Sequence, residues 1–412
     1  MSVTAAPAAS CALHDAGTCR SCPHLSLPMP DQLAAKQSRV AALLAEHVPS
    51  ELWQAPAASA PTGFRNKAKM AVAGTAAHPT LGILDGAGCG VDLRTCPLHV
   101  PAIEAALPVL ADLVTELGLR PYDVPSRRGE LKHVLVTASP DDDLMVRFVL
   151  RSRHHLERLR AAVPDLHRRL PQLAVAAVNI QSVHQAVIEG PEEIVLTEED
   201  RLLMRLRLPS PDGSSRTGRC TDDVELPLYL PTRSFFQTNT AVAEALYATA
   251  RDWVEEARPA RVWDLFCGVG GFALALAAPG RRVLGVEVSA SAIDGARAAA
   301  DLMGLDPALV RFEAGDARVL DPADPDGSTP GEVKAERPDL LVVNPPRRGI
   351  GEQLATRIEA SGVERVLYSS CNPRTLAADL AHLPSMRVVR SRLFDMFPHT
   401  EHAEVLVELV RD

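Results

Sequence analysis

The chain has 412 residues, of which 46% are hydrophobic and 23% are charged, as in an ordinary globular protein of two or three domains. Its net charge of −9 argues against a protein that coats nucleic acid nonspecifically, because such binding needs many phosphate contacts. No apolar run reaches the ~18 residues that cross a bilayer, and the N-terminus lacks the pattern of a signal peptide. We therefore expect a cytoplasmic protein without a membrane span.

The first half of the chain predicts a mixture of strands and helices. Leu33, Val40 and Leu44 fall near helical spacing, and Gly118 is placed to end a second helix. A turn-like PDDD separates two apolar runs, which predicts a hairpin. The expected elements are helix 31–48, short strands within 64–150, helix 101–118, strands 133–139 and 144–150, helix 154–169 and strand 173–181.

After about residue 240 the pattern changes to strands that alternate with helices, which predicts a doubly wound parallel sheet. A polar segment rich in turn formers, 209–223, precedes the change and is expected to be a surface loop, as is 321–338. The expected helices are 239–257, 271–278, 290–304, 351–361 and 374–381. The expected strands are 261–266, 281–288, 310–316, 339–344 and 365–370, followed by the last strands of the chain.

A glycine-rich turn follows the first strand of this alternating region, in VWDLFCGVGGFALALA (262–277). Such a turn lets a ligand approach bare backbone at a helix N-terminus. Glu287 ends the next strand, nineteen residues past Gly268, where a carboxylate accepts hydrogen bonds from ribose hydroxyls. The dinucleotide pattern G-x-G-x-x-G is not met, because residue 273 is Ala. Cys267, inside the motif, is expected to be a small buried neighbour.

The motif resembles the first motif of class I S-adenosylmethionine methyltransferases, and VVNPPRRG (342–349) supports that resemblance. Asn344 ends the fourth strand, at the edge of the sheet where α/β proteins bind ligands. In amino-group methyltransferases an aromatic residue usually follows Asn-Pro-Pro. Here Arg347 and Arg348 follow, which disfavours an exocyclic amine as the methyl acceptor.

Cys371, in RVLYSSCNP, follows the fifth strand and should face the same edge as Asn344. A core cysteine lies more often inside the apolar run than after Ser-Ser, so we predict a nucleophile. Carbon 5 of uracil is too weakly nucleophilic to take a methyl group directly. A thiolate that adds to carbon 6 creates an enolate, which makes carbon 5 reactive. We expect the site to lower the pKa of the thiol, since the thiolate is the nucleophile.

A base must then remove the carbon 5 proton so that the thiol can leave. The segment DMFPHTEHAEVLVEL (395–409) offers candidates, and Glu404 opens its alternating strand, 33 residues past Cys371. That distance accommodates one helix and a returning strand. We predict Glu404 as the base, with Glu401 and His402 nearly as well placed by spacing.

Three cysteines lie near the N-terminus, in CALHDAGTCRSC, and others lie far downstream. Two cysteines separated by two residues, with two further cysteines, suit either zinc or an iron–sulfur cluster. Cys89 and Cys96 compete as the fourth ligand on spacing. Cys220, in the polar segment, is expected to have no role.

Taken together, SSCN, NPPRRG, DLFCGVGGF, SFFQTN and DMFPHTEHAE resemble the RNA 5-methyluridine methyltransferases over nearly the whole chain, from Cys11 onward. The start of the chain and FRNKAKM look most like bacterial members that act on one uridine of 23S rRNA. The chain begins almost at the cysteines, so we expect no OB-like domain before them.

The resemblance implies a role for each motif residue. It implies Cys371 as nucleophile and Glu404 as proton acceptor, with S-adenosylmethionine as cofactor. It implies that Asn344, where many relatives have Asp, cannot relay a proton. It implies the following cofactor-binding residues: Gln237, Phe266, Glu287 and Asn344, to which the glycine-rich turn adds Gly268. It implies the following ligands of a 4Fe–4S cluster with a structural role: Cys11, Cys19, Cys22 and Cys96.

The expected fold is α/β. A Rossmann-like class I methyltransferase domain (236–412) follows an N-terminal iron–sulfur segment (1–97) and a central α+β RNA-recognition domain (98–235). Contacts with the 23S rRNA substrate are expected from stacking side chains and from cations that bind phosphate. These residues are Phe235, Phe236, Arg65, Lys67 and Lys69. We expect a monomer with no obligate protein partner.

Three alternatives remain open. The same chemistry could serve another ribosomal or transfer RNA uridine. An iron–sulfur oxidoreductase would bind a dinucleotide in the glycine turn and form no covalent RNA adduct. A catalytically idle RNA-binding protein would tolerate Cys371→Ala.

Overall fold

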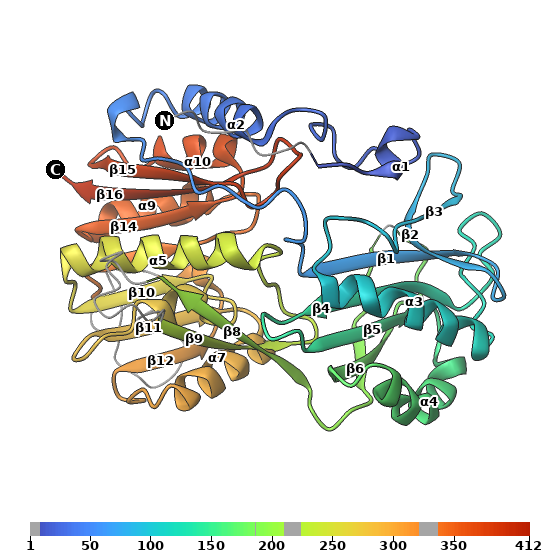
Figure 1. Cartoon of the computed structure of the whole chain (residues 1–412). Coiled ribbons are helices and arrows are strands. Elements are labelled where there is room, and N and C mark those ends of the chain that lie inside the picture. Colours follow the sequence, from blue (N-terminus) through green and yellow to red (C-terminus); the bar gives the residue numbers. More distant parts are fainter. Residues whose placement is uncertain (1–8, 186, 210–223, 321–336) are drawn as a thin grey trace, which may run out of the picture.

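The computed structural model describes residues 9–185, 187–209, 224–320 and 337–412. Within these residues the strands form two seven-stranded sheets and one two-stranded ribbon (Figure 1). Residues 210–223 of the loop expected at 209–223, with Cys220, and most of the loop expected at 321–338 lie outside the described residues. No helix in the described part is long and apolar enough to cross a membrane.

The first sheet, called the central sheet, has the order β3-β2-β1-β4-β5-β6-β7. Neighbouring strands pair antiparallel, except that β5 and β6 are parallel around the crossover helix α4. Its elements are β1 (Lys67–Gly74), β2 (Pro79–Leu84), β3 (Gly90–Asp92), α3 (Pro101–Glu116), β4 (Leu131–Ala138), β5 (Leu144–Leu150), α4 (Leu156–Arg169), β6 (Leu173–Ile180) and β7 (Glu192–Val195).

One face of the central sheet forms a core with α3 and α4. Alternate residues of β1, Ala68, Met70 and Val72, join that core, as the period of two in a strand requires. The predicted hairpin of β4 and β5 is confirmed. Helix α3 ends at Glu116, two residues before the predicted end, and Gly118 follows its cap with φ of +57°. The predicted domain boundary at residue 97 divides the strands of this one sheet, because β1 to β3 precede residue 97 and β4 to β7 follow it.

The second sheet, called the C-terminal sheet, has the order β12-β11-β10-β13-β14-β16-β15. Its first five strands are parallel, as predicted, and β16 returns antiparallel between β14 and β15. Its elements are α5 (Thr240–Ala257), β10 (Arg261–Leu265), α6 (Gly271–Ala275), β11 (Arg282–Glu287), α7 (Ala290–Leu302), β12 (Val310–Ala314), β13 (Leu340–Val343), α9 (Gly351–Ser361), β14 (Arg365–Ser370), α10 (Pro373–Leu380), β15 (Met386–Phe394) and β16 (Glu404–Arg411).

Both faces of the C-terminal sheet are covered, which makes it doubly wound. Helices α5, α6 and α7 pack on one face, together with the ribbon of β8 (Arg201–Leu208) and β9 (Val224–Pro231). Helices α9 and α10 pack on the other face, and α2 (Met29–Leu43) joins them through Val40. Helix α2, although near the N-terminus, therefore packs on the C-terminal sheet rather than on the central one, as Figure 1 shows.

Four short helices complete the described elements. These are α1 (Ala12–Asp15) and the 3₁₀ turns Ser50–Leu52, Arg153–His155 and, after β12, Ala317–Val319. The helix predicted over 271–278 is shorter than expected, because α6 ends at Ala275 and a turn at Gly280, with φ of +75°, leads into β11.

Candidate active site

The carboxyl ends of the parallel strands border a cavity of about 600 Å³. Parallel strands end at the same edge of a sheet, so the turns that follow β10, β11, β13 and β14 all reach this cavity. The predicted site residues that line it are Cys371, Glu404, Gln237, Phe266, Gly268, Glu287, Asn344, Phe235 and Phe236. We call it the strand-end cavity.

The glycine turn after β10 is tightly constrained. Gly270 has φ of +87°, and a Cβ on Gly271 would lie 2.4 Å from the Tyr247 hydroxyl, so neither position accepts a side chain. Phe266 adopts φ of +70° although it is not a glycine, and its N–H donates to the Val286 carbonyl at 3.0 Å. A non-glycine residue held in this region is typical of a functional site.

Asp264, near the end of β10, holds the glycine turn in place, and no sequence motif identified it as a site residue. Its carboxylate is fully buried and accepts a 2.9 Å hydrogen bond from the Ala273 N–H, which ties β10 to α6. The other carboxylate oxygen has no hydrogen-bond partner within the described part of the chain. Burial raises the pKa of Asp264 to about 7, and the nearby Glu287 carboxylate adds to that rise. Cys267 is buried in the same turn, as predicted.

The register of β14 and β16 brings Cys371 and Glu404 together. The last pair of this antiparallel ladder is Ser370 with Val405, so Cys371 and Glu404 follow as the next residues on the two strands. Both side chains line the strand-end cavity. Glu401 and His402 lie in the preceding loop, are exposed and border a smaller cavity of about 240 Å³ on another side of Cys371.

The environment of Glu404 suits a proton acceptor. Its side chain is 2% exposed, and the Ser369 hydroxyl donates to its carboxylate at 2.5 Å. Burial raises the pKa of Glu404 from 4.5 to about 7, and the hydrogen bond from Ser369 opposes the rise. A general base works best when its pKa lies near the working pH.

The expectation that the site lowers the pKa of Cys371 is wrong for the protein as described. Partial burial raises the pKa of this thiol above its ordinary value, and the Glu404 carboxylate adds to the rise. The guanidinium of Arg347, which hydrogen-bonds the sulfur, acts in the opposite direction. The sequence interpretation did not assign Arg347 to the thiol, because 24 residues separate the two in the chain.

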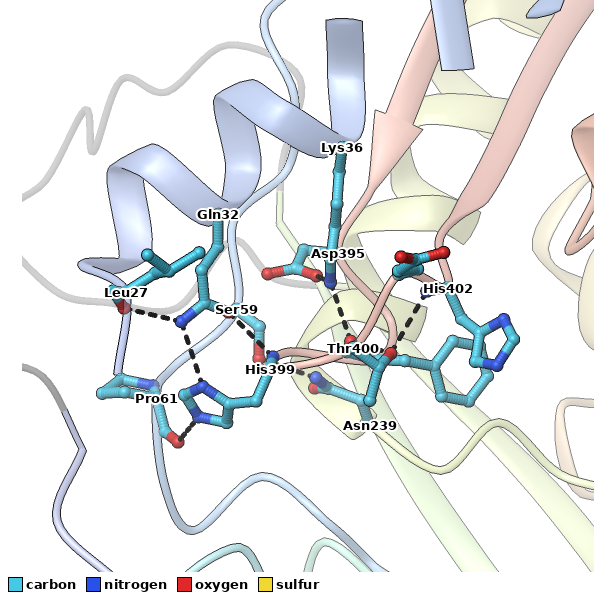
Figure 2. Close-up of polar contacts among 12 residues, drawn as sticks. Leu27, Gln32, Lys36, Ser59, Pro61, Asn239, Asp395, His399, Thr400 and His402 are labelled. Atoms are coloured by element: carbon cyan, nitrogen blue, oxygen red, sulfur yellow. Dashed lines mark hydrogen bonds and ion pairs between the residues drawn. The ribbon is translucent and has the colours of Figure 1, made fainter. Parts of the chain in front are cut away.

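Polar side chains of helix α2 hold the loop that leads to Glu404 (Figure 2). The Lys36 ammonium donates to Asp395 at 2.5 Å and to the Phe397 carbonyl at 2.7 Å, with both charged side chains at most 3% exposed. Gln32 accepts a hydrogen bond from the His399 N–H at 2.9 Å. His399 has φ of +62°, and Phe397 lines the strand-end cavity. Helix α2 therefore helps to shape the site.

The predicted RNA-contacting residues differ in their surroundings. Phe236 is 3% exposed and belongs to the core, whereas the ring of Phe235 is 69% exposed at the cavity. Arg65 is half-buried beside Cys22 and Cys96. Burial lowers the pKa of Lys67 to about 8. Lys69, on the same strand, is exposed and can reach phosphate.

The four predicted cluster cysteines share one neighbourhood, and Cys89 does not belong to it. Burial raises the pKa of Cys22 to about 11, and the thiols of Cys96, Cys19 and Cys11 each add to that rise. Cys89 is exposed in the turn between β2 and β3. Among the described residues, no group of three or more His, Cys, Asp or Glu side chains has the arrangement that would hold one metal ion.

Known proteins resemble this chain along almost its whole length. The family model described as tRNA (Uracil-5-)-methyltransferase matches residues 222–412. The 23S rRNA (uracil(747)-C(5))-methyltransferase of Halothiobacillus neapolitanus is 48% identical over 97% of this chain and 99% of its own length. The enzyme of the same name from Escherichia coli K12 is 44% identical, with the same coverage of both chains.

A solved structure shares the fold. The tRNA (uracil-54, C5)-methyltransferase of Pyrococcus abyssi, in complex with S-adenosyl-L-homocysteine, superposes with a TM-score of 0.74 and 23% identity, over 95% of this chain and 85% of its own. This similarity shows a methyltransferase fold, and the near-half identity to the curated enzymes over their full length shows the family. The chain belongs to the RNA uracil-C5 methyltransferases.

Proposed function

We propose that this protein transfers a methyl group from S-adenosylmethionine to carbon 5 of one uridine in 23S rRNA, at the 747-type position. The observation that carries the proposal is the placement of Cys371 opposite Glu404, at the cavity bordered by the glycine turn. The relatives at 44% and 48% identity are named for this reaction, which supports the choice of RNA. Because ribosomal RNA is its substrate, we place the protein in the cytoplasm.

The cofactor fits the glycine-turn side of the strand-end cavity. When bound, S-adenosylmethionine supplies an electrophilic methyl group on a sulfonium. Glu287 is placed to accept hydrogen bonds from ribose hydroxyls, and Gly268 leaves the backbone open to close approach. Gln237, Phe266 and Asn344 line the remaining wall. Asn344 can donate or accept a hydrogen bond, but its amide does not ionise and so cannot relay a proton.

The chemistry proceeds by covalent catalysis followed by proton removal. The Cys371 thiolate adds to carbon 6 of uracil, which makes carbon 5 an enolate carbon. Carbon 5 then takes the methyl group, as its new bond forms and the methyl–sulfonium bond breaks. The Glu404 carboxylate removes the carbon 5 proton, and the carbon 6–sulfur bond breaks to release the product and the thiolate. Arg347 is placed to stabilise that thiolate.

A substrate that blocks the last step tests this mechanism. Fluorine at carbon 5 cannot leave as a proton, so a 23S rRNA fragment with 5-fluorouridine at the target should form a stable adduct on Cys371, mapped by mass spectrometry. Cys371→Ala should form none, while Cys89→Ala, which changes an exposed thiol elsewhere, should form the adduct normally. Methyl transfer without a trapped complex contradicts the mechanism, and trapping only on a transfer RNA fragment contradicts the choice of RNA.

We further propose that Cys11, Cys19, Cys22 and Cys96 hold a 4Fe–4S cluster. Their thiols raise one another's pKa, which supports a common site that four thiolates could share. Each cysteine of such a cluster binds a different iron, so the sulfurs lie farther apart than around one ion, consistent with the lack of a single-ion arrangement among the residues that the structure describes. The cluster would tie the first residues to the central sheet, because Cys96 follows β3.

Metal analysis after anaerobic purification tests the cluster. The native protein should contain iron and acid-labile sulfide in equal amounts, and Cys22→Ser should lose most of both. Cys89→Ser is the matched control and should retain them. A stoichiometric zinc content without sulfide would contradict the proposal in favour of a zinc site.

A further inference from the structure

We propose that a second cavity, on the central sheet, binds an unpaired base of the same RNA that is methylated at the strand-end cavity. This inference rests on the proposed function. The cavity has a volume of about 370 Å³ and lies on the face of the sheet opposite α3 and α4. Its floor includes Ala71 of β1 and His133 of β4, which are cross-strand partners. We call it the central-sheet cavity.

The polar groups of this cavity suit a nucleobase. The Nδ1 atom of His133 is buried and has no hydrogen-bond partner in the described part of the chain. Burial lowers the pKa of His133 to about 4, so its ring is neutral at pH 7 and keeps one acceptor nitrogen. An orphaned buried ring nitrogen costs free energy unless something pairs with it. The edge of a base carries both donors and acceptors that could do so.

The cavity also offers an aromatic surface. The ring of Tyr122 lines it, and the Tyr122 hydroxyl lies 3.0 Å from Nδ1 of His184. The Lys132 ammonium lies 4.7 Å from the centre of the Tyr122 ring and donates to the Val183 carbonyl at 2.8 Å, which fixes this wall. Aromatic rings beside a cation are the usual platform for unstacked bases.

Apolar side chains border the mouth of the cavity. Leu84, Val124 and Val187 are 38%, 44% and 54% exposed, although each is large and hydrophobic. Lys69 and Arg127 are exposed cations on elements that line the cavity or its rim. A mouth with both apolar contacts and cations matches a single-stranded RNA, whose bases are apolar on their faces and whose backbone is anionic.

Strand β1 connects the two cavities. Asn66, just before β1, donates to the Gln237 carbonyl at 3.0 Å at the edge of the strand-end cavity. Ala71, five residues on, lines the central-sheet cavity. At about 3.3 Å per residue the separation along β1 is roughly 17 Å. Stacked nucleotides advance about 3.4 Å each, so roughly five of them span it. Lys67 and Lys69 lie on the same face of β1 as Ala71, between the two ends.

A second connection runs along the segment 187–191. Val187 lines the central-sheet cavity, and Glu189 pairs with Arg147 of β5 at 2.9 Å. The Pro191 carbonyl accepts a 2.8 Å hydrogen bond from Arg233, two residues before Phe235 of the strand-end cavity. The segment 187–191 therefore runs from the wall of the central-sheet cavity to a contact two residues from Phe235 of the strand-end cavity. An RNA with its target uridine at Cys371 can place a nearby base at His133.

Filling the cavity tests the proposal. Ala71→Phe should raise the Kd for a 23S rRNA fragment about 10-fold, because loss of one bound base costs about that much. The Kd for S-adenosylmethionine and the methylation rate at saturating RNA should stay within about twofold. Ala161→Phe, which places the same ring on the exposed side of α4 on the other face of the sheet, is the matched control. Unchanged RNA affinity in Ala71→Phe overturns the proposal.

Crosslinking to the native protein gives an answer that needs no variant. The experiment uses a set of RNA fragments, each with 5-fluorouridine at the target, which fixes its register on Cys371. Each fragment also carries 4-thiouridine at one neighbouring position, and this position differs from one fragment to the next. Irradiation should link one of these positions to a peptide that contains Tyr122 or His184. No link to the cavity from any position overturns the base site. Failure of the Cys371 adduct itself would instead contradict the proposed function.

Discussion

The two large sheets of this protein carry their sites in different ways. In the C-terminal sheet, parallel strands end at one edge, and short turns place Gly268, Glu287, Asn344 and Cys371 around one cavity. In the central sheet, mostly antiparallel strands put the cavity on a face, where its walls come from β1, β2, β4 and two loops. A site at strand ends leaves short sequence motifs, while a site on a sheet face spreads over the chain and leaves none.

The comparison also separates two tasks. The strand-end cavity holds the buried Glu404 and the half-buried Cys371, which suits bond making and proton transfer. The central-sheet cavity has an apolar mouth, an aromatic ring and nearby cations, which suits binding. Changes in the C-terminal sheet should therefore alter rates, and changes in the central sheet should alter RNA affinity. The predictions below test whether the two tasks are separable.

The largest effect is expected from Glu404→Gln. Without the carboxylate the carbon 5 proton is removed slowly after the methyl group has been transferred, so the turnover rate should fall about 10²- to 10⁴-fold while RNA affinity stays unchanged. The covalent complex should accumulate with unmodified RNA and be visible by denaturing electrophoresis. Rapid turnover by this variant would show that another group, such as Glu401 or His402, is the base.

The pH dependence of the native enzyme follows from the same carboxylate. The pKa of Glu404 is raised to about 7, and only the deprotonated form accepts a proton. The rate at which the covalent adduct releases its product should therefore fall tenfold for each unit as pH drops below about 7, whereas with an ordinary glutamate this step would remain active down to about pH 4.5. A single-turnover rate that stays constant from pH 8 to pH 5.5 would contradict this.

Lys36→Met should give the next largest effect, on stability. The variant leaves Asp395 buried without its cation, and breaking such a pair costs about 3–5 kcal/mol in the free energy of unfolding, measured with urea. The double variant Lys36→Met, Asp395→Leu should recover much of this loss, because no charge is then left unpaired. If α2 were only an appendage of the N-terminal segment, the single variant would unfold like the native protein.

The smallest effect is expected from Lys69→Ala in the central sheet. Loss of one exposed phosphate contact should weaken RNA binding a few-fold and lower the slope of log Kd against log salt by about 0.7 to 0.9. The methylation rate at saturating RNA should not change. Arg158→Ala, on the exposed face of α4, is the control and should leave both quantities unaltered. A change in rate rather than in affinity would mean that the two sheets are not independent.

The sequence by itself determined most of the C-terminal sheet. Alternating apolar segments predict its parallel strands, and the short motifs give the residues at their ends, from the glycine turn to Cys371. Such predictions succeed because each motif is local: the strand, the turn and the functional residue lie within a few positions of one another. The hairpin of β4 and β5 and the stop of α3 just before Gly118 were predictable for the same reason.

Only the tertiary structure decided which distant residues meet. The antiparallel register of β16 against β14, rather than spacing, places Glu404 and not Glu401 or His402 opposite Cys371. Burial, which no local pattern fixes, sets the pKa of Glu404 near 7 and raises that of Cys371. The packing of α2 against the loop at Asp395 depends on contacts across more than 350 residues, because side chains far apart in the chain become neighbours only when sheets and helices pack.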